Sequence, residues 1–138
     1  WMKDEVNRLD LTDKVQFLGR FSVERMPSFF SHADAMLISL LDKPVYGMTI
    51  PSKLQSYFMA GKPILGMLSG EGARTLKMSD SGMTADAGDY QGLANAVLEL
   101  SSLNQAALLE MGRNSKRFGA ENYSKDKLMD ALELLIKV

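Results

Sequence analysis

The sequence predicts an α/β protein built on a parallel, doubly wound sheet. Short apolar runs alternate with amphipathic segments, the order expected when helices connect parallel strands. The run Ile64–Leu68 is apolar at nearly every position, as in a strand covered on both faces. Just before it, Pro51 suits the first position of a helix, while Gly61 and Pro63 suit its end.

The first half of the chain is expected to contain a polar helix, a strand, an amphipathic helix and a second strand. In order these are Trp1–Leu11, with Val6, Leu9 and Leu11 facing inward, Val15–Leu18, a helix after Ser22 with Met26, Phe29 and Phe30 on one face, and Ala35–Leu41. A loop over residues 42–50 then leads to the helix that begins at Pro51.

The second half is expected to contain a helix, a weaker strand and three more helices. The pattern predicts a helix over Gly70–Met78 and a strand over Ser81–Ala85. Asp89, Asn104 and Ser124 each stand where an N-cap begins an amphipathic segment. These three consecutive helices are expected to close one side of the sheet.

Composition limits the function classes. The 138 residues fit one domain, and 46% hydrophobic with 24% charged residues is typical of a globular protein. A net charge of −1 gives no overall attraction to nucleic acid. The absence of cysteine excludes disulfides and thiolate chemistry and fits a reducing cytoplasm. No apolar run is long enough to span a membrane.

The turn before the Pro51 helix has the parts of a phosphate-binding site. It follows the predicted strand Ala35–Leu41, and ligands of open parallel sheets bind at the carboxyl ends of the strands. The free N–H groups of a helix start can hold an anion. Helix starts of this kind are common, so the geometry alone leaves simple capping by Ser52 open.

The same segment resembles the donor-site motif of glycosyltransferase family 4, in the nucleotide-sugar-binding half of the GT-B fold. The motif often reads P-S-K-L-x-E-Y-x-A-x-G-K-P-I. The resemblance extends in the right order over about Val6 to Leu135, through Val15–Arg20, Ser31–Leu40, Pro51–Ile64, Met111–Ser115 and Phe118–Ser124. It implies a donor-binding Rossmann-like domain over residues 1–138, a UDP-linked donor and no dependence on a bound metal.

The resemblance also implies a role for each of ten residues. Arg20 and Phe21 would border the nucleobase, Tyr46, Gly47, Met48 and Thr49 would form the floor under the sugar, Pro51, Ser52 and Lys53 would hold the diphosphate, and Ser56 would face the ribose. No residue is assigned to catalysis. His32, the only histidine, is expected to be structural, and Asp42 and Glu71 form no recognisable acid pair.

The chain departs from the family pattern at two positions where many members carry glutamate. These positions are Met48 and Ser56. They suggest a branch with a different donor, and similar variants occur in branches that transfer N-acetylated amino sugars during surface-polysaccharide synthesis in bacteria. A non-catalytic nucleotide-sugar-binding module therefore stays open beside the transferase. A phosphorylation switch of the receiver type is strongly disfavoured, because no acidic residue follows the first predicted strand and Lys62-Pro63 precedes its strand instead of following one.

The front of the family domain is expected to be missing. Trp1 stands where the helix after the second family strand should begin, so the first βαβ unit and the acceptor-binding N-terminal domain would belong to a longer parent. Two absent strands would separate Val15–Leu18 from Ala35–Leu41. We therefore expect an inactive fragment that either self-associates through open sheet edges or is a remnant of a longer protein. The parent would be cytoplasmic, with membrane association left open.

Overall fold

A three-stranded parallel sheet forms the centre of the protein. The computed structural model describes residues 1–136. The strands β1 (Met36–Ser39), β2 (Ile64–Met67) and β3 (Gly82–Ala85) lie in the order β1-β2-β3. Met36 is paired with Ile64, and Ile64 with Gly82. The α/β prediction is confirmed, and three of the four expected strands are present with shorter bounds.

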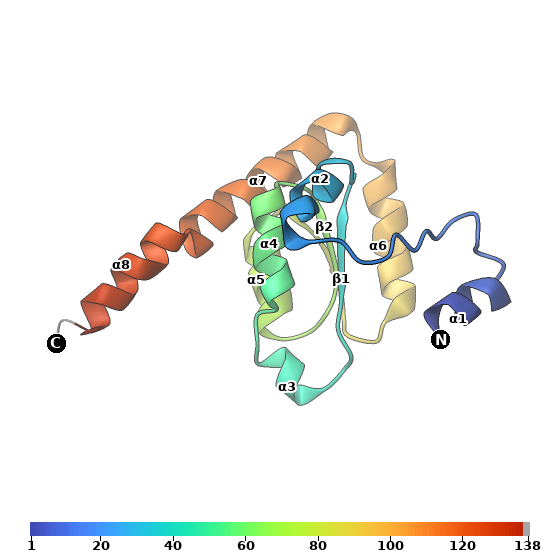
Figure 1. Cartoon of the computed structure of the whole chain (residues 1–138), viewed down its shortest axis with the longest axis horizontal. Helices are drawn as coiled ribbons and strands as arrows, with labels where there is room; N and C mark the ends of the chain where they lie inside the picture. The colour runs from blue at the N-terminus through green and yellow to red at the C-terminus, as the bar shows by residue number, and fades with distance from the viewer. Residues whose placement is uncertain (137–138) are drawn as a thin grey trace.

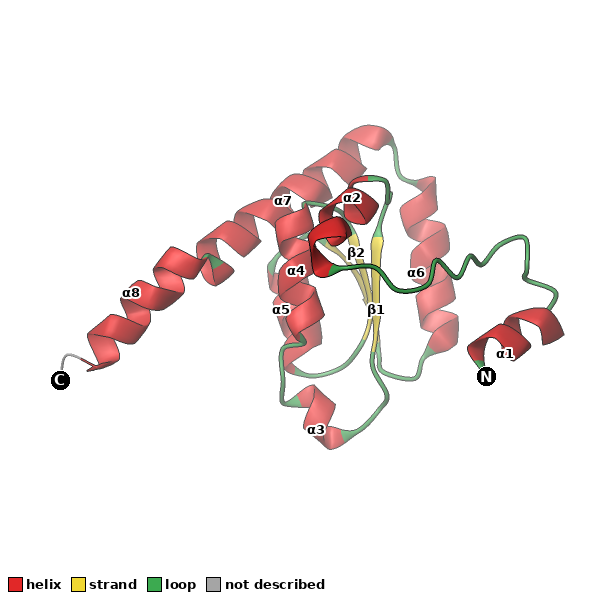
Figure 2. Ribbon diagram, viewed as in Figure 1, coloured by secondary structure: helices red, strands yellow, loops and turns green. Residues whose placement is uncertain are grey.

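Helices surround the sheet and extend beyond it (Figures 1 and 2). In chain order they are α1 (Met2–Arg8), the 3₁₀ turn η1 (Val23–Arg25), α2 (Met26–Ser31), α3 (Pro44–Gly47), α4 (Ser52–Ala60), α5 (Glu71–Met78), α6 (Tyr90–Ser102), α7 (Gln105–Tyr123) and α8 (Lys125–Ile136). None of these helices is long and apolar enough to cross a membrane.

Each face of β2 is covered by a separate apolar cluster. Ile64 packs with Leu54, Phe58 and Leu76 of α4 and α5 on one face. Leu65, its neighbour along the strand, packs with residues of α6 on the other face. Successive strand residues point to opposite faces, so an apolar residue at every position is what two covered faces require.

The ends of the helices follow the local signals in the sequence. Gly61 ends α4 in the left-handed conformation, with φ +66°, which glycine adopts without a steric penalty. The carboxylate of Asp89 accepts a hydrogen bond from Gly92 N–H at 2.8 Å, and Asn104 caps α7 in the same way. Pro51 differs by one position, because it is the N-cap of α4 and Ser52 is the first helical residue.

The segment Val15–Leu18 is not a strand, so that prediction is wrong. Its side chains are exposed, and Leu18 keeps 57% of its surface accessible. A β-strand needs a neighbouring backbone for its hydrogen bonds. Within residues 1–136 the sheet contains β1, β2 and β3 alone, and none of them is paired with this segment.

The two ends of the chain also depart from expectation. Helix α1 is shorter than Trp1–Leu11 and buries no residue, and Leu9 and Leu11 are exposed. Among the three C-terminal helices, α6 covers the sheet and α7 packs on α4. Figure 1 shows α8 continuing away from the sheet, and it has no buried residue. Of these three helices, α6 makes the main contact with the sheet.

Candidate functional site

A groove lies at the carboxyl end of β1, where the chain turns toward α4. Its volume is about 410 Å³. One wall is the end of β1 and the residue after it, and the other comes from the loop and the first turn of α4. The lining residues are Leu37, Ile38, Ser39, Leu40, Tyr46, Thr49, Pro51, Ser52 and Lys53.

The first turn of α4 supplies hydrogen-bond donors to this groove. Pro51 precedes the helix with ψ 134°, and no side chain caps it. The amide of Leu54 is satisfied by the Pro51 carbonyl oxygen at 2.9 Å. The remaining N–H groups of a helix start carry partial positive charge and can bind an anion. Ser52 adds a hydroxyl at the same place.

Lys53 adds a positive charge to the groove. It is exposed, and it takes part in none of the ion pairs within residues 1–136. A free cation in the first turn is slightly unfavourable to the helix itself, because it meets the positive end of the dipole. An anionic ligand bound at this position would be attracted by both Lys53 and the helix start and would offset that repulsion.

The loop between β1 and α4 is folded on itself by local hydrogen bonds. Tyr46 N–H donates to the Lys43 carbonyl oxygen at 3.0 Å, and Thr49 Oγ1 donates to the Tyr46 carbonyl oxygen at 3.3 Å. These bonds shape α3, which forms inside a segment predicted as a loop. They bring Tyr46 and Thr49 to the groove. Met48 is 72% exposed and lines neither this groove nor the smaller cavity described next.

A smaller cavity of about 170 Å³ adjoins the first at the same edge of the sheet. It shares Leu40 and Tyr46 with the groove and adds Gly47, Ser69 and Ala87. Ala87 N–H donates to Ser69 Oγ at 3.0 Å, which joins the chain after β2 to the chain after β3. Sequence reasoning missed Ser69 and Ala87. Their position directly after two predicted strands was the available signal.

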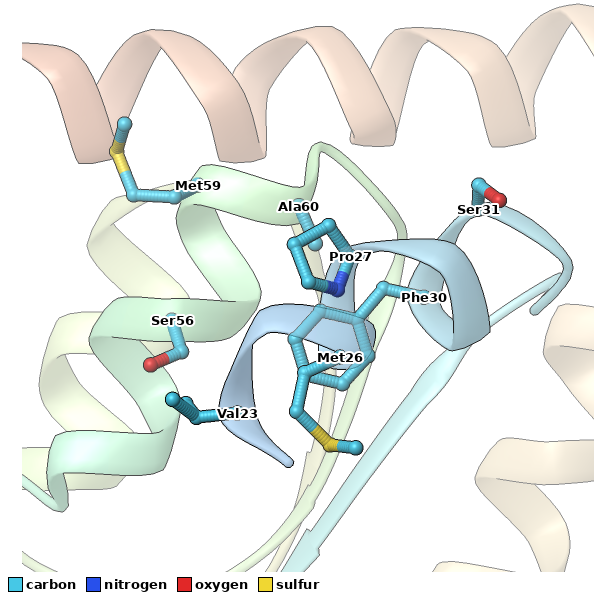
Figure 3. Close-up of a pocket in the computed structure, with 8 residues that line it drawn as sticks. All are labelled: Val23, Met26, Pro27, Phe30, Ser31, Ser56, Met59 and Ala60. Atoms are coloured by element: carbon cyan, nitrogen blue, oxygen red, sulfur yellow. The ribbon is translucent and has the colours of Figure 1, made fainter. Parts of the chain in front are cut away.

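Ser56 lies in a different groove from Ser52. This third groove has a volume of about 520 Å³ and runs between α4 and the η1–α2 segment (Figure 3). Its other lining residues are Val23, Met26, Pro27, Phe30, Ser31, Met59 and Ala60. Ser56 Oγ donates to the Ser52 carbonyl oxygen at 3.5 Å, and its side chain is exposed.

Arg20 and Phe21 are not brought to either cavity at the carboxyl edge. The ring of Phe21 packs on Phe29, with centroids 4.8 Å apart, and the Arg25 guanidinium lies 5.1 Å from the Phe21 ring centre. Arg20 is exposed. Since Val15–Leu18 is not part of the sheet, nothing anchors the following residues at its carboxyl edge.

Two of the remaining titratable candidates, His32 and Glu71, have local partners, and the third, Asp42, lines the smaller cavity. His32 Nδ1 lies 2.7 Å from the Ser28 carbonyl oxygen, one helical turn away. Glu71 forms an ion pair with Arg74. Within residues 1–136, no group of three or more His, Cys, Asp or Glu side chains is placed to hold a metal ion. The polar groups of the carboxyl edge are therefore N–H groups, hydroxyls and Lys53 in the groove, with Asp42 and Lys43 in the smaller cavity beside it.

The carboxyl edge thus combines the start of α4 with a lysine that takes part in no ion pair within residues 1–136. Residues 1–102 match the family described as glycosyl transferases group 1. The chain belongs to this family. A search of curated proteins found no match.

The fold of this group 1 glycosyltransferase chain is also that of a solved enzyme. Sucrose-phosphate synthase from Thermosynechococcus elongatus matches with a TM-score of 0.84 and 18% sequence identity. The match covers 99% of this chain and 33% of the synthase chain. At this identity the likeness shows the fold, a Rossmann-like α/β domain of the GT-B type. The chain spans about a third of that protein's length.

Six of the ten residues assigned from the sequence lie at the carboxyl edge of the glycosyltransferase domain. They are Tyr46, Gly47, Thr49, Pro51, Ser52 and Lys53. Arg20, Phe21, Met48 and Ser56 line neither cavity there. The roles of all ten residues remain predictions.

Proposed function

We propose that this domain binds the nucleotide diphosphate sugar donor of a glycosyltransferase. The observation that carries the proposal is the groove at the end of β1, where the start of α4, Ser52 and Lys53 meet. Backbone N–H groups, a hydroxyl and a free ammonium are suited to two adjacent phosphates. The groove is also at the edge where open parallel sheets bind ligands.

The reaction of the parent would move the sugar from the diphosphate to an acceptor hydroxyl. The bond between the anomeric carbon and the diphosphate oxygen breaks, a bond to the acceptor oxygen forms, and the acceptor hydroxyl loses its proton. Negative charge then develops on the departing diphosphate. The helix start and Lys53 would stabilise that charge in the transition state.

We further propose a family 4 enzyme of a bacterial cytoplasm, with a UDP-linked donor and an N-acetylated amino sugar. The acceptor would be a growing polysaccharide or a lipid-linked sugar, held by a separate N-terminal domain of the parent. Support comes from the motif Pro51–Leu54 and from Met48 and Ser56 in place of glutamates. We propose no bound metal or other cofactor.

A transfer assay on the full-length parent tests this function. A panel of UDP- and GDP-linked sugars is incubated with the parent, and release of the nucleoside diphosphate is measured with and without acceptor extract. We expect acceptor-dependent release from one UDP sugar. Tight UDP binding by calorimetry without any transfer would instead favour the non-catalytic binding module. An absence of UDP and GDP binding would contradict both functions.

A further inference from the structure

Two glycines at the start of α5 lie directly against the segment that borders the proposed donor site. Gly70 is the N-cap of α5, with φ +69° and ψ −139°, a conformation that is essentially restricted to glycine. A Cβ atom at Gly70 would overlap the Gly47 carbonyl oxygen and would lie 2.6 Å from the Gly47 Cα. The backbone of α5 therefore rests on the backbone of α3 with no side chain between them.

Gly72 makes the corresponding contact two residues later. It is buried, and a Cβ atom there would lie 3.2 Å from Cδ of Pro51, the N-cap of α4, and would overlap the end of the Leu68 side chain. Gly72 shows no positive φ, so alanine would not be strained there by its backbone conformation. One turn of α5 thus supports both ends of the segment 47–51.

We propose that Gly70 and Gly72 are positioning residues for donor binding. This inference rests on the function proposed above. The segment 47–51 carries Thr49 into the groove and ends at the start of α4. The distance of this segment from β1 sets the width of the groove. Because Gly70 and Gly72 have no side chains, the backbone of α5 can pack directly against the segment and fix that distance. A methyl group at Gly70 would push the segment away from α5, because it would overlap the Gly47 backbone. One at Gly72 would displace the end of the Leu68 side chain and crowd Pro51 in a packed interior.

The test compares three alanine variants of the full-length parent. Gly70→Ala and Gly72→Ala place a methyl group against the segment. Gly61→Ala is the matched control, because Gly61 also has a positive φ, of +66°, but its Cβ would meet Lys116 Cβ at an ordinary 3.4 Å. Each variant is first checked for folding by its thermal transition.

Two readouts then separate the inference from the proposed function. Amide hydrogen exchange measures the order of residues 42–54 without any ligand, and calorimetry measures the affinity for UDP. We expect several-fold faster exchange of this segment in Gly70→Ala and Gly72→Ala, and about tenfold weaker UDP binding, because a displaced segment loses part of its contact with the ligand. Gly61→Ala should match the wild type in both.

The outcomes are distinct. Unchanged exchange and affinity in folded Gly70→Ala and Gly72→Ala, or the same changes in Gly61→Ala, would overturn the positioning role. If Gly70→Ala does not fold, Gly72→Ala decides, because its backbone conformation suits alanine. If the wild type binds no UDP, the proposed function fails, while the exchange data still decide whether the glycines hold the segment.

Discussion

The ring of Phe58 stacks on the ring of Tyr123, with centroids 6.0 Å apart and planes 8° from parallel. Phe58 belongs to α4, whose first turn borders the proposed donor site, and Tyr123 ends α7. Phe118 packs beside both rings, 5.0 Å from Phe58. The position of the donor-site helix therefore depends on the C-terminal part of the chain as well as on the sheet.

Phe58→Ala should strongly destabilise the protein. The side chain is fully buried in the main apolar cluster, and its removal would leave a cavity between α4 and α7. Removal of a buried phenylalanine typically costs about 3–5 kcal/mol of unfolding free energy. Urea denaturation measures the change. Val97→Ala, at an exposed position of α6, is the control and should cost far less. A similar loss in both variants would contradict the packing.

Ser52→Asp should abolish UDP binding by the parent. The new carboxylate would stand at the first position of α4 and repel the phosphates, while the helix itself favours a negative charge there. Calorimetry gives the affinity. Asn104→Asp is a matched control, because it adds the same charge to the N-cap of α7 and preserves a good capping residue. Unchanged affinity in Ser52→Asp would show that the diphosphate binds elsewhere.

Ser56→Ala should weaken UDP binding by about 0.5–1.5 kcal/mol, the range of a neutral hydrogen bond. Ser56 is exposed and accessible to a ligand in the groove between α4 and α2. Ser101→Ala is the control, since Ser101 Oγ also donates to a carbonyl oxygen of its own helix, that of Leu98. If the two variants bind UDP as well as the wild type does, Ser56 does not contact the ribose.

Tyr57→Phe should reduce the loss of stability at alkaline pH. Burial against neighbours such as Phe30 raises the pKa of Tyr57. The unfolded chain releases the phenolic proton at its ordinary pKa of about 10, while the folded chain still holds it. The contribution of Tyr57 to stability is therefore fully present below the unfolded pKa and is lost as the pH rises through the folded pKa.

Thermal unfolding measured at several pH values from about 8 to 11 checks this prediction. Part of the decline should remain in Tyr57→Phe, because burial also raises the pKa of Tyr123, partly offset by a hydrogen bond with Thr75. An equal decline in the wild type and the variant would show that Tyr57 ionises alike in both states.

The isolated 138-residue chain should self-associate. Met36 and Leu40 donate their N–H groups to the β2 side, so the alternate residues Leu37 and Ser39 present theirs at the outer edge of β1. Open strand edges and the exposed apolar segment Val15–Leu18 both promote pairing. Light scattering after size exclusion measures the mass. A monomer at every concentration would contradict this prediction.

Local signals predicted the elements whose ends and faces are encoded nearby in the chain. The caps Asp89 and Asn104 satisfy their own helix starts, and Gly61 supplies its own left-handed turn, so none depends on distant contacts. Ile64 and Leu65 indicated a strand covered on both faces, because successive apolar residues of a strand point to opposite faces of the sheet. The proposed donor-site segment was predicted from its motif and from the rule for carboxyl ends of parallel strands.

Only the tertiary structure decided which of these parts meet. Val15–Leu18 has the composition of a strand, yet strand formation requires a partner backbone, and no local pattern states whether one is adjacent. The separation of Ser56 from Ser52 into two grooves depends on where the η1–α2 segment packs. The contacts of Gly70 with Gly47 and of Gly72 with Pro51 join residues more than twenty positions apart. Close packing between distant segments is a property of the folded chain, because it follows from how all the helices and strands fill space together.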